Sequence, residues 1–210
     1  MQGADKERFG ELNVERINVV DEDGTVRLVI ANKERFPDPV IGGRVLRRQG
    51  IRTPGILFYN NAGDECGGLI FGSREENGEY SSGSALLFDQ YRQDQIIGIT
   101  TSESNGRRKY GFTVWERPDT PLADMVDRVE AVRQMEAGPE REQAMQQLEE
   151  EGAFGARRAF MGRMEDGEVM MALADSKGRD RIRMRVDAND QPRIEFLNEK
   201  GDVIFSLPPA

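Results

Sequence analysis

The chain has 210 residues and a formal net charge of −9, from 38 acidic and 29 basic side chains, with a single cysteine and no histidine. These numbers exclude Ser-His-Asp or Cys-His catalysis within the chain, an intrachain disulfide and zinc sites of the usual histidine-containing kind. The acidic balance also opposes binding to nucleic acids and anionic membranes, which depends on summed cationic charge.

Targeting signals are not evident in the sequence. No stretch is long and apolar enough to span a bilayer, and the polar start Met1–Arg8 is not a signal peptide. A cytoplasmic protein and a mature exported protein both remain open. Cys66 precedes Gly67-Gly68 and has Asp64 and Glu65 beside it, so we expect a small packed residue rather than a reactive thiol.

The first half of the chain predicts β-hairpins. After a flexible start at residues 1–10, apolar–polar alternation predicts strands at Leu12–Val20 and Thr25–Asn32, joined by the turn Asp21-Glu22-Asp23-Gly24. A Pro/Gly/Arg-rich loop with one short strand at Arg44–Arg48 follows. Further strands are predicted at Ile56–Asn60, Gly68–Gly72, Ser84–Tyr91, Gln95–Thr101 and Tyr110–Glu116.

Helical patterning interrupts the strands over residues 119–152. Thr120 is a suitable N-cap, Pro121 suits the first helical position, and Met125, Val129 and Val132 recur at helical spacing, which predicts packing against the sheet. Gly138-Pro139 then separates a second helix, Glu140–Glu150.

The last part of the chain predicts a regular meander. Turns near Gly167, Gly178, Asn189 and Gly201 separate alternating strands. A consistent register places Leu173 opposite Ile182, Met171 opposite Met184, Met184 opposite Ile194 and Phe196 opposite Val203, with all these side chains on one face. We expect that face to pack onto an interior shared within the chain.

The predicted fold is therefore all-β: an antiparallel β-hairpin meander, closed as a barrel, propeller-like or folded as a sandwich, with an inserted helical hairpin. We expect one domain over residues 11–208 with the first and last strands near each other. Two β subdomains, 11–118 and 153–208, are the alternative.

The segment Phe88–Gln95 is the strongest candidate for a site, because it occupies a hairpin end without the usual Gly, Pro or Asn. With the preceding Gly78–Ser84, expected to be a mobile loop, it suggests a pocket for a small polar ligand or carbohydrate. The candidate ligand-binding residues are Glu79, Tyr80, Ser82, Asp89, Tyr91, Arg92, Asp94 and Trp115.

Arginines form the second candidate. Arg181, Arg183 and Arg185 share the polar face of one predicted strand, and the register places Arg183 opposite Glu195 and Arg185 opposite Arg193. These four arginines suggest contact with an anion or a partner, or a solvated face paired with cross-strand acids. No metal ligands or cofactor motifs occur, so we expect no cofactor.

Three functions stay open. The first is a non-catalytic β-scaffold for binding or assembly, which associates with itself or contacts a protein partner through the helical insertion. The second is a ligand- or carbohydrate-binding module around residues 79–94. The third is a histidine-free hydrolase or isomerase that uses Asp89 and Asp94.

Overall fold

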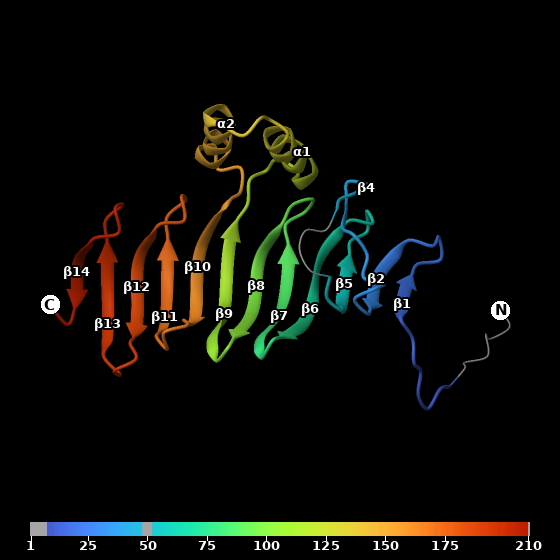
Figure 1. Cartoon of the computed structure of the whole chain (residues 1–210), viewed down its shortest axis with the longest axis horizontal. Coiled ribbons are helices and arrows are strands. Elements are labelled where there is room, and N and C mark those ends of the chain that lie inside the picture. Colours follow the sequence, from blue (N-terminus) through green and yellow to red (C-terminus); the bar gives the residue numbers. More distant parts are fainter. Residues whose placement is uncertain (1–7, 48–51, 210) are drawn as a thin grey trace.

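A computed structural model describes residues 8–47 and 52–209. Within them, twelve antiparallel strands form a single-layer sheet in the order β1-β2-β5-β6-β7-β8-β9-β10-β11-β12-β13-β14 (Figure 1). The strands are β1 (Arg16–Val20), β2 (Val26–Ala31), β5 (Gly55–Tyr59), β6 (Glu65–Glu76), β7 (Glu79–Asp89), β8 (Gln95–Ser104), β9 (Arg107–Glu116), β10 (Ala156–Arg163), β11 (Val169–Ala174), β12 (Asp180–Val186), β13 (Pro192–Leu197) and β14 (Val203–Leu207).

The remaining elements are two short strands and two helices. β3 (Val40–Ile41) and β4 (Arg44–Val45) pair with each other, and α1 (Leu122–Arg133) and α2 (Pro139–Glu150) connect β9 to β10. The prediction of an antiparallel hairpin meander with an inserted helical hairpin is therefore confirmed.

Seven hairpin turns in the described residues share one backbone geometry. The first residue's N–H donates to the carbonyl of the fifth residue, and the fourth residue's N–H donates to the carbonyl of the first. These turns begin at Asp21, Asn60, Gln90, Met164, Asp175, Asp187 and Asn198.

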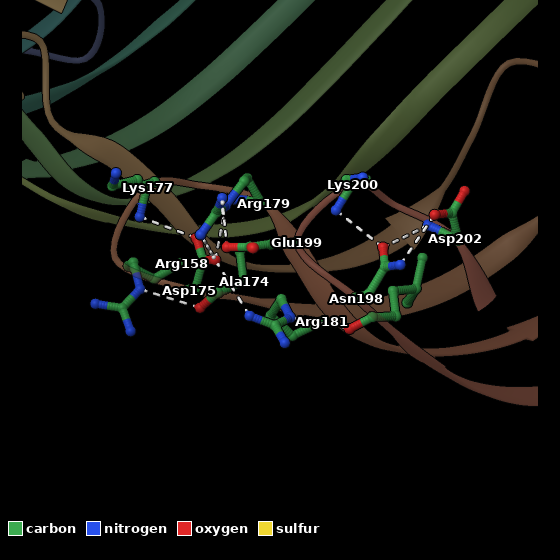
Figure 2. A network of polar contacts seen from close by, with 11 residues as sticks. Arg158, Ala174, Asp175, Lys177, Arg179, Arg181, Asn198, Glu199, Lys200 and Asp202 are labelled. Carbon is green, nitrogen blue, oxygen red and sulfur yellow. Dashed lines mark hydrogen bonds and ion pairs between the residues drawn. The ribbon is translucent and has the colours of Figure 1, made fainter. Parts of the chain in front are cut away.

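Asx side chains reinforce four of these turns. In the turns that begin at Asn60, Asp175, Asp187 and Asn198, the Oδ1 atom of the first residue also accepts the N–H groups of the third and fifth residues. Figure 2 shows the neighbouring turns at Asp175 and Asn198. Because these contacts are local, each turn forms where the sequence predicts it.

The register of the C-terminal meander agrees with three of the four predicted pairs. Met171 lies opposite Met184, Leu173 opposite Ile182, and Met184 opposite Ile194. The prediction for Phe196 is wrong: it lies opposite Phe205, and Leu197 lies opposite Val203. A bulge between Phe196 and Leu197 shifts the register beside the Asn198–Asp202 turn.

Several segments differ from the predictions: β3 was not predicted, and the strand expected at Leu12–Val20 begins only at Arg16. β10 was not predicted, because Arg157 and Arg158 interrupt its alternation at a bulge against β9. The expected mobile loop at residues 78–84 is wrong, because residues 79–84 are the first half of β7: all of them pair with β6, and residues 81–84 also pair with β8.

The helices lie beyond one end of the strands rather than over the sheet (Figure 1). The N-cap of α1 is Pro121, not Thr120, and no side chain caps the helix. Instead the N–H of Leu122 donates to the carbonyl of Arg92 in the β7–β8 turn, at 2.9 Å. The predicted packing of the Met125 stripe against the sheet is also wrong, since Met125 forms a buried cluster with Leu148 of α2 and with Ala153.

The sheet is open in the described part of the chain. β1 and β14 form its opposite edges, so the expectation that the first and last strands lie near each other is wrong, and no closed barrel is found. The expected shared interior is wrong too, because Met184 and Phe196 are 43% and 39% exposed.

The buried side chains lie elsewhere. Val29 and Leu57 are covered by Phe36 of the segment between β2 and β3, and Phe160 clusters with Ala172 and Met170 on the same face of the sheet. The chain therefore buries one face of its sheet in patches and leaves the other face uncovered.

Candidate interaction surface

Two cross-strand rows of apolar residues run across the uncovered face of the sheet, from one edge to the other. We call these 24 positions, two from each strand, the apolar face. The first row is Ile17, Ile30, Ile56, Leu69, Leu86, Ile99, Phe112, Met161, Met171, Met184, Ile194 and Leu207. The second row is Val19, Leu28, Phe58, Gly67, Phe88, Ile97, Val114, Ala159, Leu173, Ile182, Phe196 and Phe205.

Every position of the apolar face except Gly67, which is buried and has no side chain, is at least partly exposed. Met161 is 55% and Ile99 54% exposed. Twelve strands about 4.8 Å apart make the sheet roughly 53 Å wide, and two rows of side chains cover about 15 Å along the strands, so the face measures roughly 800 Å². A contiguous apolar patch of more than a few hundred Å² is typical of an interaction site.

Charged groups lie at the end of this face, where the long hairpins of β6–β9 extend past the two rows. The Tyr80 hydroxyl donates to Glu103 at 2.5 Å, and Arg108 pairs with the same carboxylate at 3.1 Å. The hydrogen bond from Tyr80, followed by that from Arg108, lowers the pKa of Glu103. The same bond to Glu103 raises the pKa of Tyr80. The apolar face therefore has a polar rim and no charge within its two rows.

A hollow deepens the apolar face near the C-terminal edge of the sheet. It has a volume of about 520 Å³ and is lined by Met184, Ile194, Leu207 and neighbouring residues of β11–β14. Its lining is mainly apolar, so it suits an inserted hydrophobic side chain.

The opposite face is closed by side chains that lie flat over glycines. A Cβ on Gly98 would lie 2.8 Å from Leu87 Cδ2 and 3.0 Å from Trp115 Cζ3, and the Phe160 ring covers the facing glycines Gly111 and Gly162 in the same way. Such aromatic cover of strand glycines stabilises a sheet without a second layer.

Ion pairs complete the opposite face near the C-terminus. Glu195 is buried and pairs with Arg183 at 3.0 Å and with Arg185 at 2.9 Å, while Arg185 also binds Glu168 at 2.7 Å. The predicted cross-strand pairs Arg183–Glu195 and Arg185–Arg193 are confirmed. Arg181 donates to the carbonyl of Leu197 and pairs with Asp175 at 3.5 Å (Figure 2). These contacts favour the interpretation that the arginines pair with cross-strand acids. They make the alternative, a binding site for an external anion, less favourable.

The eight candidate ligand-binding residues do not converge. Glu79, Tyr80 and Ser82 lie at the start of β7, whereas Asp89 ends that strand, so Tyr80 and Asp89 are roughly 30 Å apart along the strand. Tyr91, Arg92 and Asp94 follow Asp89 in the turn, and Trp115 in β9 lies against Gly98.

The β7–β8 turn instead connects the loops at its end of the sheet. Arg92 Nε donates to the buried carboxylate of Asp64 at 3.2 Å, and Asp64 also accepts the N–H of Gly42 at 2.6 Å. The buried Gln93 donates to the carbonyl of Thr120 at 2.6 Å, before α1. Asp94 pairs with Arg117 at 3.4 Å. The unusual composition of this turn thus has a structural explanation.

Cys66 lies in an environment that disfavours its thiolate. Partial burial, and then the charges of Asp89 and Glu65, raise the pKa of its thiol. The described residues contain no cluster of acidic or cysteine side chains that could hold a metal ion. None of the described helices is long and apolar enough to cross a membrane.

A groove beside β6–β8 is a further concave feature of the described residues. It has a volume of about 880 Å³, and its polar lining includes Lys33, Arg52, Arg74, Thr53, Ser81 and Thr100. Ser82 also borders this groove, the only one of the eight candidate ligand residues among its lining. Gly72 and Gly83 contribute no side chains to its floor, and the side chain of Thr53 lies over Gly72, 3.2 Å from where a Cβ would be.

No protein-family model matches the chain, and a search of curated proteins finds no significant match.

Proposed function

We propose that this protein is a non-catalytic β-scaffold that works by associating with protein through the apolar face of its sheet. The observation that carries the proposal is the pair of uncharged rows that crosses all twelve strands without cover from any described residue. Burying an apolar area of roughly 800 Å² at about 25 cal/mol per Å² is worth on the order of 20 kcal/mol before the costs of association, which take up much of this gain. The area therefore favours a covering protein without setting its affinity.

The helical insertion is a weaker candidate for the contact surface. The apolar stripes of α1 and α2 pack on each other and on the loops of the same chain. Arg44 forms two hydrogen bonds of 2.8 Å with Asp127 of α1, so the basic loop and the acidic helix already satisfy each other. These contacts indicate that the helical insertion stabilises the loops at this end of the sheet.

Methionine oxidation tests whether the face is covered where the protein works. Met171 of the apolar face and Met135, two residues after the end of α1, are both 37% exposed, so they form a matched pair. In the crude extract of the cells that make the protein, we expect peroxide to oxidise Met135 readily and to spare Met161, Met171 and Met184. Equal oxidation of Met135 and these three residues would contradict the proposed function.

The groove beside β6–β8 supports a second candidate function, the binding of an anionic carbohydrate. Its cations Lys33, Arg52 and Arg74 stand beside hydroxyl groups, which is the chemistry that recognises sulfated or carboxylated sugars. Each cation also pairs with one exposed or half-buried carboxylate, Glu34, Asp38 and Glu76 respectively, so an anionic sugar would have to compete with these exposed pairs.

Calorimetric titration with a sulfated oligosaccharide and its desulfated form tests this binding. We expect only the sulfated form to bind, Arg74→Ala to weaken binding by about tenfold, and Arg133→Ala on α1 to leave it unchanged. Equal affinity for both sugars, or no binding, would exclude the groove as an anion site.

A further inference from the structure

We infer that the apolar face is covered by a second copy of this chain, in a face-to-face dimer with two-fold symmetry that forms a two-layer β-sandwich. This inference rests on the proposed function and names the partner. The interior that the sequence predicts within one chain would then lie between two chains.

The area of the face matches what a stable dimer needs. Standard protein interfaces bury about 800 Å² on each partner, which is roughly the area that the two rows cover. A smaller partner would leave several strands bare. A second copy brings two rows of the same width and covers all twelve strands.

The shape of the sheet also favours a second copy. Twisted sheets pack face to face when their twists match, with strand directions within about 30° of each other. Two identical chains necessarily have the same twist. Both also carry two small residues, Gly67 and Ala159, among the large residues of the second row, which leaves room for large side chains of a facing sheet such as Phe88.

The distribution of charge permits this contact despite the net charge of −9. The two rows contain no ionisable side chain, so no charge loses water when the faces meet. The charged groups near the face, including Glu103 and Arg108, lie at its rim, where they stay hydrated. An anionic bilayer fits the same face less well, because the acidic chain repels it.

The two-fold axis passes near the centre of the sheet if the faces overlap fully, because an isologous contact pairs each position with its symmetry mate. The central strands of the twelve are β8 and β9, and Ile99 of β8 is 54% exposed at that centre. A substitution of Ile99 is therefore present in both chains of the dimer, and the two substituted side chains lie close to each other.

Charge-swap variants at Ile99 test the dimer by light scattering after size exclusion. We expect the unmodified chain to have twice the monomer mass of 23.7 kDa at micromolar concentration. Ile99→Lys and Ile99→Glu should each be monomers, with dissociation constants raised roughly 100-fold or more, because each dimer would bury two like charges. An equimolar mixture of the two variants should restore a dimer. Ile204→Lys on the opposite face of β14, where Ile204 is 65% exposed, is the control and should remain dimeric.

A β-type circular-dichroism spectrum must accompany each result, which is expected because Ile99 is already half exposed. A monomeric unmodified chain would overturn the inference, as would a dimer that Ile99→Lys leaves intact or a mixture that stays monomeric. If the purified chain is a monomer while Met161, Met171 and Met184 remain protected in the extract, the homodimer fails and the proposed scaffold function survives with another partner. If those methionines are oxidised like Met135 in the extract, the function fails as well.

Discussion

The close approach of β9 and β10 at two facing glycines makes Gly111→Ala a sensitive test of the closed face. A Cβ at position 111 would lie 2.5 Å from the carbonyl oxygen of Met161, 2.8 Å from Phe160 Cε2 and 2.9 Å from the Cα of Gly162. Carbon atoms in proteins pack at about 3.5–4.0 Å, so the strands must separate by several tenths of an ångström or more. Two of the three obstacles are backbone atoms, which cannot move aside by changing rotamer.

The magnitude follows from two opposing terms. Overpacking of this kind costs about 1–3 kcal/mol, and backbone obstacles favour the upper end. Alanine also reduces the entropy of the unfolded chain, which returns about 0.4–1 kcal/mol. We therefore expect Gly111→Ala to lower the free energy of unfolding by about 2 kcal/mol.

Urea unfolding at one fixed protein concentration measures this loss. Gly10→Ala is the control, because no atom lies within 4 Å of the added Cβ and the position has no positive φ. Gly83→Ala in β7, whose Cβ would lie 3.1 Å from the carbonyl oxygen of Thr101, should be intermediate. If Gly111→Ala is as stable as Gly10→Ala, the argument that glycines and a covering aromatic ring close this face is wrong.

Three further predictions concern the polar contacts. Asp64→Ala should lower the free energy of unfolding in urea by about 2–3 kcal/mol, because it removes the hydrogen bonds that the buried carboxylate accepts from the Gly42 N–H and from Arg92. Asp21→Ala in a more exposed pair should cost less than about 1 kcal/mol, and equal losses would contradict this. The hydrogen bond from Arg179 lowers the pKa of Asp175 from 3.8 to about 2, so its stabilisation is complete above pH 3.8 and lost as the pH falls towards 2. Acid titration of unfolding should show a shallower loss of stability over that range for Asp175→Asn, and an unchanged slope would refute this. Cys66 should react with a maleimide more slowly at pH 7 than a free cysteine does, and an equal rate would show that its thiol pKa is not raised.

Much of the fold was predictable because its signals are local. The alternation in Val169, Met171 and Leu173 assigns a face to each side chain, and the Asx turns at Asp175 and Asn198 fix where each strand ends. Register follows from the turn, so the neighbours of Met184 could be named in advance. The predicted partner of Phe196 is wrong, because a bulge beside it shifts the register, and no residue of the following turn indicates that bulge.

The candidate ligand site was not predictable, because it depended on whether distant residues converge. Residues 78–84 contain Ser and Gly, which is typical of a loop. Pairing with β6, and from Ser81 also with β8, nevertheless holds residues 79–84 in an eleven-residue strand that separates Tyr80 from Asp89. The odd composition around Gln93 did indicate a special position. The hydrogen bond from Gln93 to the carbonyl of Thr120 could not be predicted, because it depends on the path of the chain before α1.

The sequence alone determined that this chain is a series of hairpins with apolar and polar faces, since periodicity and turn chemistry act between near neighbours. Only the tertiary structure decided that the apolar faces align in two unbroken rows, and that the helices lie beyond the strand ends instead of over those rows. The physical reason is that the presence or absence of a covering layer depends on contacts between segments far apart in the chain, for which no local pattern exists.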